Sequence, residues 1–327
     1  MKQIIGMGNV LVDALYKVDS DSALAALGLQ KGGMTLIDGA RFATIATQMA
    51  DASAKRTTGG SACNTIQALA RLGAPTGLFG KVCDDDNGRF FADSFAALGV
   101  RTALLRDAQP TGVASTFITP DGQRTFATHL GAAALLEADD VQPALFDGYS
   151  YLYIEGYLVQ SHALIERAVD LARAAGLMVC IDLASYNVVE AEHDFFARLL
   201  PKTDIVFANE EEAHAFTALP AEEALDALAR ICRVAVVKVG KEGAMARSGA
   251  DVARVPAGNA PAVVDTTAAG DYFAAGFLYA HARNASLEAC LQVGTVLANQ
   301  IIQVVGTKLA DNVWAEIKTE VDAVLKA

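Results

Sequence analysis

The chain has 327 residues, of which 53% are hydrophobic and 20% charged. It is longer than the most common domain size, but it fits either one large α/β core with a small inserted element or two compact domains. The composition is too apolar for a disordered chain. The net charge of −12 argues against a broad basic surface for nucleic acid or an anionic membrane.

Targeting signals and metal-binding patterns are not apparent in the sequence. The chain runs from Met1 directly into an expected strand, with no signal-peptide pattern, which predicts a cytoplasmic protein. The uncharged stretch 289–307 contains several Gln and Asn residues and is predicted to be a buried helix rather than a membrane span. Five scattered cysteines without a Cys-x-x-Cys pair predict reduced thiols, and no zinc-binding pattern is present.

From about residue 60, apolar segments with helical period alternate with short β-branched runs. We expect helices at 62–72, 88–98 and 161–175, and strands at 177–181, 204–208 and 234–239. Such alternation is typical of βα units around a parallel sheet. The sequence therefore predicts a three-layer α/β/α sandwich with a mainly parallel sheet.

Two regions, 14–58 and 112–128, break this alternation. Residues 112–118 read as a strand, 120–122 as a turn and 124–126 as a returning strand, which together form a hairpin. With the extended patches 14–18 and 34–37, the hairpin is expected to build a small second sheet over one edge of the core. No linker separates the regions, so we interpret residues 1–327 as a single domain with an inserted lid.

The most informative stretch is Val263-Val264-Asp265-Thr266-Thr267-Ala268-Ala269-Gly270-Asp271. We expect a strand, then a turn of small residues, then a helix at 272–281 whose first N–H groups are unpaired. Such a turn binds anions, and Asp271 at its mouth is placed to accept a proton from an attacking hydroxyl. Taken alone, Asp271 is more simply explained as a helix cap.

This stretch resembles the Asp-Thr-x-Gly-Ala-Gly-Asp signature of the PfkB (ribokinase) family of sugar and nucleoside kinases, with Ala268 in place of a glycine. The resemblance implies that Asp271 is the catalytic base and that the backbone of Ala268, Ala269 and Gly270 binds the transferring phosphoryl group. An alanine at position 268 is tolerable at negative φ and awkward at positive φ.

Two further motifs resemble the family's acceptor-binding elements. Gly59-Gly60-Ser61-Ala62-Cys63-Asn64 looks like its Gly-Gly-x-x-x-Asn box, and the run from Gly8 to Asp13 looks like its opening Gly-x-x-x-x-Asp, taken here as the end of the first strand. Gly59, Gly60, Asn64 and Asp13 are thus candidate contacts to hydroxyl groups. The alternatives are a flexible turn at the glycines and, weakly, a dinucleotide fold at the N-terminus.

Several other segments resemble the family's nucleotide-binding motifs. Asn209 and Glu212 match an Asn-x-x-Glu motif, and the resemblance implies that they position Mg²⁺, with Glu212 acting through water; without it, an acidic first helical turn is ordinary dipole stabilisation. Additional candidate nucleotide contacts are Lys238, Gly240, Gly243, Asp265, Thr267 and Asn299. Family members often use K⁺ near the loop that contains Asp265.

Residues 121–132 resemble the lid strand of the adenosine-kinase-like branch, which makes Arg124 a candidate contact to substrate or phosphate. We therefore expect an ATP-dependent kinase, monomeric or homodimeric, that phosphorylates a primary hydroxyl of a nucleoside or sugar and binds neither nucleic acid nor membrane. Tyr16, Phe42 and Phe117 are candidates for stacking on a base. A fructokinase-type sugar kinase and a non-catalytic sugar or nucleoside sensor are the alternatives.

Overall fold

The computed structural model describes residues 2–50, 54–121, 123–258 and 260–327. Its larger sheet has the strand order β14-β13-β12-β11-β10-β9-β1-β5-β6, and all its strands from β12 to β6 run parallel. The strands are β1 (Ile4–Met7), β5 (Thr76–Cys83), β6 (Arg101–Asp107), β9 (Tyr151–Glu155), β10 (Met178–Asp182), β11 (Ile205–Asn209), β12 (Val234–Lys238), β13 (Ala244–Ser248) and β14 (Asp251–Val255). Strands β13 and β14 form an antiparallel extension.

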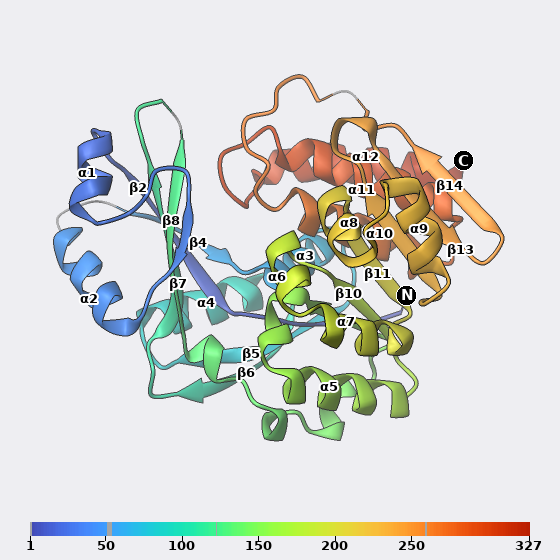
Figure 1. The fold of residues 1–327 in the computed structure, drawn as a ribbon, viewed down its shortest axis with the longest axis horizontal. Helices are drawn as coiled ribbons and strands as arrows, with labels where there is room; N and C mark the ends of the chain where they lie inside the picture. The colour runs from blue at the N-terminus through green and yellow to red at the C-terminus, as the bar shows by residue number, and fades with distance from the viewer. Residues whose placement is uncertain (1, 51–53, 122, 259) are drawn as a thin grey trace.

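Helices cover both faces of this sheet (Figure 1). One face packs against α3 (Ser61–Arg71), α4 (Asp86–Ala97), α10 (Ala269–His281), α11 (Leu287–Ile301) and α12 (Asp311–Lys326). The other packs against α5 (His162–Ala174), α6 (Tyr186–Ala191), α7 (His193–Leu199), α8 (Glu210–Thr217) and α9 (Ala221–Ala229). Successive side chains of β9 point to opposite faces of the sheet. Tyr151 and Tyr153 pack in the core on the first face, and Leu152 and Ile154 pack in the core on the second. The predicted three-layer sandwich is confirmed.

Short 3-10 turns join several of these elements. They lie at Ala132–Leu135, Ala138–Asp140, Pro143–Phe146, Gly156–Gln160, Leu200–Lys202 and Gly240–Glu242. No helix among the described residues is long and apolar enough to cross a membrane.

The expected second sheet is also present. Its order is β3-β8-β7-β2-β4, formed by β2 (Leu11–Lys17), β3 (Met34–Leu36), β4 (Lys55–Gly59), β7 (Thr111–Ile118) and β8 (Arg124–Gly131). Helices α1 (Asp21–Ala26) and α2 (Gly39–Gln48) pack on one of its faces, at the left of Figure 1. Gly122, in the predicted hairpin turn, lies outside the described residues.

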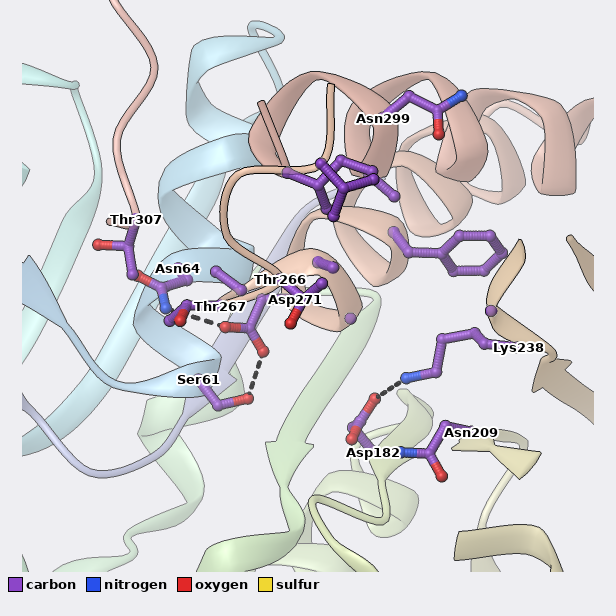
Figure 2. A pocket seen from close by; sticks show the side chains of 18 of the residues that line it. Ser61, Asn64, Asp182, Asn209, Lys238, Thr266, Thr267, Asp271, Asn299 and Thr307 are labelled. Carbon is purple, nitrogen blue, oxygen red and sulfur yellow. Dashed lines mark hydrogen bonds and ion pairs between the residues drawn. The ribbon is translucent and has the colours of Figure 1, made fainter. Parts of the chain in front are cut away.

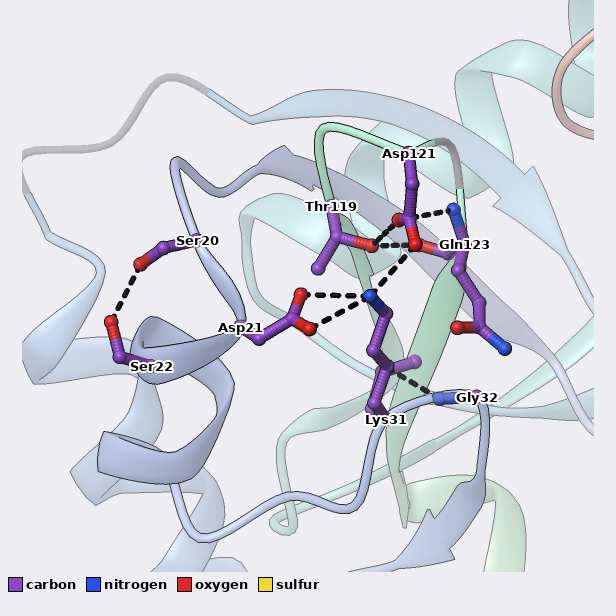
Figure 3. A network of polar contacts seen from close by, with 9 residues as sticks. Ser20, Asp21, Ser22, Lys31, Gly32, Thr119, Asp121 and Gln123 are labelled. Atoms are coloured by element: carbon purple, nitrogen blue, oxygen red, sulfur yellow. Dashed lines mark hydrogen bonds and ion pairs between the residues drawn. The ribbon is translucent and has the colours of Figure 1, made fainter.

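The tip of the β7–β8 hairpin is tied to the segment around α1 by Lys31 (Figure 3). The Lys31 ammonium lies 2.8 Å from Asp21 and 2.8 Å from Asp121, and Asp121 also accepts a hydrogen bond from Thr119. This partly exposed network connects the hairpin to the α1 region away from the main sheet.

Two local expectations are wrong. Residues 263–265 do not form a strand: their amides at Val264 and Asp265 donate to the carbonyl of Ile302, at 2.7 and 3.1 Å, so the end of α11 takes the place of a strand partner. Asp13 does not end the first strand. It lies inside β2 of the small sheet, because the chain crosses from one sheet to the other between Met7 and Leu11.

Candidate active site

A cavity of about 970 Å³ lies where the small sheet faces the carboxyl ends of the parallel strands (Figure 2). Strands β10, β11 and β12 end there at Asp182, Asn209 and Lys238. The sequence-predicted residues that line it are Asp13, Gly60, Asn64, Arg124, Asn209, Glu212, Lys238, Gly240, Gly243, Thr267, Ala268, Ala269, Gly270, Asp271 and Asn299. Gly59 and Asp265 are not among its lining residues; both lie directly behind the wall.

The small-residue turn lies at the start of α10. Ala268 adopts a left-handed conformation, with φ 64° and ψ 7°, and the helix begins at Ala269. The amide of Ala269 donates to the carbonyl of Thr266 at 3.1 Å, so it is not available to an anion as expected. The amide of Gly270 has no acceptor among the described residues, as expected in a first helical turn. Of the three amides expected to bind an anion, that of Ala269 has an acceptor among the described residues, whereas those of Ala268 and Gly270 have none.

The carboxylate of Asp271 is held by two donors from α3 (Figure 2). Ser61 donates its hydroxyl to Oδ1 at 2.6 Å, and Asn64 donates its amide to Oδ2 at 2.9 Å. Burial raises the pKa of Asp271 to about 6, although these two hydrogen bonds oppose the shift. At neutral pH the group is thus mainly ionised and still basic enough to accept a proton. Asn64, expected at the acceptor's hydroxyls, is bonded to this carboxylate.

The start of α3 is fixed by Glu155 at the end of β9. Glu155 is 1% exposed and accepts hydrogen bonds from the Asn9 amide, the Asn9 side chain and the Ala62 amide, at 2.8, 2.7 and 2.8 Å. Burial raises the pKa of Glu155 to about 7. Gly60 precedes this helix at φ 97°, where a side chain would strike the carbonyl of Asn9. The box is therefore built for a close turn that orients Ser61.

Asp13 occupies the wall opposite the small-residue turn. The backbone of Gly59 passes so close to its carboxylate that a Cβ at position 59 would collide with it. Burial raises the pKa of Asp13 to about 7, and the Thr307 hydroxyl lies 3.5 Å from its Oδ2. Gly59 thus contributes space for this carboxylate rather than a surface of its own.

Lys238 lies beside the anion site. Its ammonium pairs with Asp182 at 2.9 Å, and it lies 3.2 Å from where a Cβ on Gly270 would be (Figure 2). Burial lowers the pKa of Lys238, but the carboxylates of Asp182 and Glu212 outweigh burial and raise it above its usual value. A largely buried cation next to the free amide of Gly270 favours bound phosphate.

Asn209 and Glu212 form a reciprocal capping box on α8. The Asn209 side chain accepts from the Glu212 amide at 2.8 Å, and Glu212 accepts from the Asn209 amide and side chain at 2.8 and 2.7 Å. Burial raises the pKa of Glu212 to about 7. Among the described residues no cluster of three or more His, Cys, Asp or Glu side chains is arranged to hold a metal. The Asp182 and Glu212 carboxylates fit a hydrated Mg²⁺ bound mainly through phosphates and water.

The far end of the cavity is formed by backbone and small side chains. Asn299 donates to the carbonyl of Ala257 at 2.7 Å and packs against Gly258. Gly240 and Gly243 have φ values of 52° and 105°, and a side chain at 243 would strike the carbonyl of Val255. Gly243 thus permits a close approach of its backbone to Val255, and both glycines line this end of the cavity.

The small sheet presents one of its two faces to the cavity. Leu15 pairs with Thr116, which pairs with Phe126, and Asp13 and Arg124 lie two residues from Leu15 and Phe126 on the same face. The stacking candidates Tyr16 and Phe117 alternate with these residues and face α1 and α2 instead, where their rings stack on each other at 5.4 Å.

Phe42, the third stacking candidate, lies on α2. Its ring stacks on His129 at 4.9 Å, outside the cavity. The expected stacking role is therefore wrong for Tyr16, Phe42 and Phe117. Leu15 and Phe126 are the apolar side chains that this sheet contributes to the cavity.

Arg124 reaches across the cavity to the loop before α10. Its guanidinium forms an ion pair with Asp265 and donates to the Thr267 hydroxyl at 3.2 Å. Asp265 Oδ1 also accepts from the Thr267 amide and hydroxyl, at 3.1 and 2.7 Å. The small sheet and the small-residue turn are joined at this point.

Sequence reasoning did not single out several of the lining residues, among them Asp182, Ser61, Leu15 and Phe126. The position of Asp182 directly after a buried parallel strand was an available signal, since ligands bind at the carboxyl ends of such strands. Ser61 lies inside the glycine box that the sequence singled out. Leu15 and Phe126 required the register of the small sheet.

Comparisons with known proteins find sugar kinases and adenosine kinases. The family model described as "pfkB family carbohydrate kinase" matches residues 31–313 of the chain. Adenosine kinase 2 of Arabidopsis thaliana is 25% identical, over 92% of this chain and 93% of that protein. The structure of adenosine kinase from Sinorhizobium meliloti superposes with a TM-score of 0.85 at 34% identity, covering 97% of this chain and 99% of that one. A probable sugar kinase from Rhizobium etli superposes with a TM-score of 0.87 at 32% identity, covering 99% of both chains.

Proposed function

The chain belongs to the pfkB family of carbohydrate kinases and is a sugar or nucleoside kinase, and from this premise we propose that it transfers the terminal phosphoryl group of ATP to a primary hydroxyl of a nucleoside, with Asp271 as the base. The observation that carries the proposal is the Asp271 carboxylate, held by Ser61 and Asn64 beside the free amide of Gly270. A base and an anion site must be adjacent for in-line transfer to a hydroxyl.

In the proposed reaction the acceptor hydroxyl lies between Asp271 and the phosphorus atom. Asp271 takes the hydroxyl proton as the oxygen attacks, and the amide of Gly270 with the ammonium of Lys238 offsets charge on the transferring phosphoryl group. Asp13, on the opposite wall, accepts hydrogen bonds from other hydroxyls of the acceptor and orients it. Binding holds the reacting groups in this geometry, so the entropic cost of bringing them together is met before the transfer step.

The triphosphate is proposed to extend from the start of α10 past Lys238 toward Asn299. Mg²⁺, when bound with ATP, would be held through water by Glu212 and Asp182, and it supplies positive charge to the phosphates. The base of the nucleotide is placed near Asn299, at the end of the cavity that Gly240 and Gly243 also line. The second guanidinium nitrogen of Arg124, Nη2, is buried and has no partner among the described residues, which supports a contact to the acceptor or to phosphate.

A nucleoside is favoured over a free sugar because of the wall made by the small sheet. Leu15 and Phe126 place apolar surface in the same half of the cavity as Asp13. A base would bury that surface, whereas a sugar alone would leave it in contact with water. The similarity to adenosine kinases, at 34% identity for one solved structure, supports an adenosine-like nucleoside.

The test is ATP consumption across a panel of nucleosides and sugars, including adenosine, ribose and fructose, with product detection by mass spectrometry. We expect adenosine or a close analogue to give the highest kcat/KM. Turnover with fructose or ribose alone would favour a sugar kinase. Tight binding of a nucleoside without ADP release from any acceptor would favour a sensor and reject the proposed reaction.

A further inference from the structure

Asp265 is a buried carboxylate directly before the catalytic turn, with a side chain 7% exposed. Its oxygens accept hydrogen bonds from the Thr267 amide and hydroxyl and from the Gly306 amide, the last at 2.8 Å. Arg124 supplies the positive charge in contact with it, from a side chain that is 13% exposed. A buried carboxylate is costly unless it is paired, so this arginine offsets the cost of burying Asp265.

We propose that Arg124 is a built-in counter-ion for the catalytic loop: its guanidinium takes the place of the monovalent cation that the family resemblance implies near Asp265, and the kinase proposed above therefore works without K⁺. This inference rests on the proposed function only for its activity measurements.

While Arg124 is in place, the side chain of Asp265 does not fit a K⁺ ion. Such an ion is bound by several oxygen atoms that replace its water shell. Here the Arg124 guanidinium pairs with Oδ2 of Asp265, and Oδ1 accepts from the Thr267 amide and hydroxyl. The adjacent guanidinium adds direct repulsion of a second cation at this short range.

The ion pair also links the small sheet to the catalytic turn. Arg124 belongs to β8, whereas Asp265 precedes Thr266, whose carbonyl accepts the amide of Ala269 at the start of α10. The carboxylate of Asp265 is therefore paired with Arg124 only while the small sheet is packed against the cavity. Arg124 is in this sense a positioning residue for the turn that contains Ala268 and Asp271.

The experiment compares KCl with choline chloride at equal ionic strength, using kcat/KM and the melting temperature of the ligand-free chain as readouts. The variants are Arg124→Ala, which removes the charge, and Arg124→Lys, which keeps it. Lys31→Ala is the matched control, because Lys31 is a paired cation that contacts the same hairpin, at Asp121, away from the cavity (Figure 3).

The wild type, Arg124→Lys and Lys31→Ala are each expected to change less than twofold in kcat/KM between the two salts, with equal melting temperatures. Arg124→Ala is expected to lose at least tenfold in kcat/KM in choline, to recover at least threefold in K⁺, and to melt at a higher temperature in K⁺. A tenfold loss of wild-type activity on removing K⁺ would overturn the inference. So would an Arg124→Ala variant that responds identically to both salts in both readouts.

A folding failure of Arg124→Ala is covered by the double variant Arg124→Ala/Asp265→Asn, which removes both charges. The double variant is expected to fold and to be insensitive to K⁺, because no unpaired carboxylate is left. A double variant that still melts at a higher temperature in K⁺ than in choline would overturn the inference, because no carboxylate is left for K⁺ to balance. The melting temperatures need no turnover, so they test the counter-ion even if the proposed phosphorylation is rejected.

Discussion

Removing the Ser61 hydroxyl tests how the pKa of Asp271 is set. Ser61 donates to Oδ1 at 2.6 Å, and a hydrogen bond to a charged group contributes about 1.5–3 kcal/mol. At 1.36 kcal/mol per unit, its loss in Ser61→Ala is expected to raise the pKa of Asp271 from about 6 by about 1–2 units. Protonated Asp271 cannot act as a base, so the ionised fraction at pH 7 falls and the rate there drops about two- to tenfold.

The assay is kcat/KM for the acceptor between pH 5 and pH 9. The acid limb of Ser61→Ala should lie at higher pH than that of the wild type, and activity should recover by pH 9. Thr65→Val is the matched control, because Thr65 donates to the backbone carbonyl of Asp271 at 3.1 Å and not to its carboxylate. An unshifted limb in Ser61→Ala, or a loss that persists at pH 9, would refute the reasoning.

Three further predictions concern buried groups around the site. Asp13→Asn should raise KM for the acceptor at least tenfold while changing KM for ATP little, and equal effects on both would contradict its placement. Ala268→Gly should relieve about 1 kcal/mol of left-handed strain, partly offset by greater unfolded-state entropy; its melting temperature should exceed that of Ala269→Gly, which has no such strain to relieve. Glu155→Gln should make the unfolding free energy less dependent on pH. The pKa of Glu155 rises from 4.5 to about 7 on folding, so its ionisation destabilises the folded wild type. The wild-type unfolding free energy is therefore expected to fall by about 2–3 kcal/mol between pH 5 and pH 8. Urea titrations at both pH values that give wild type and variant the same change in unfolding free energy would reject this last value.

Much of the fold was predictable because its signals are local. Helical periodicity, glycine stops and β-branched runs fix α3, α4, α5 and the strands β10 to β12 to within a few residues of their expected bounds. The glycine box and the small-residue turn also indicated which segments gather at the cavity, because those residues serve close backbone approaches that few other sequences permit.

The rest depended on contacts between distant segments. Whether Tyr16 or Leu15 faces the cavity is decided by the register of β2 on β7, and a shift of one residue would reverse it. The loop at 263–265 has the composition of a strand, but its amides bond to the end of α11. The partner of Arg124 was likewise invisible, since Asp265 meets it only after the two sheets are assembled.

The most direct test of the account is phosphoryl transfer by Asp271→Asn. This change keeps the shape of the side chain but removes the base, so kcat is expected to fall on the order of 10²- to 10⁴-fold. Dissociation constants for the acceptor and ATP, measured by calorimetry, should stay within about threefold of wild type. A variant that folds, binds both substrates and retains a wild-type kcat would contradict the central claim.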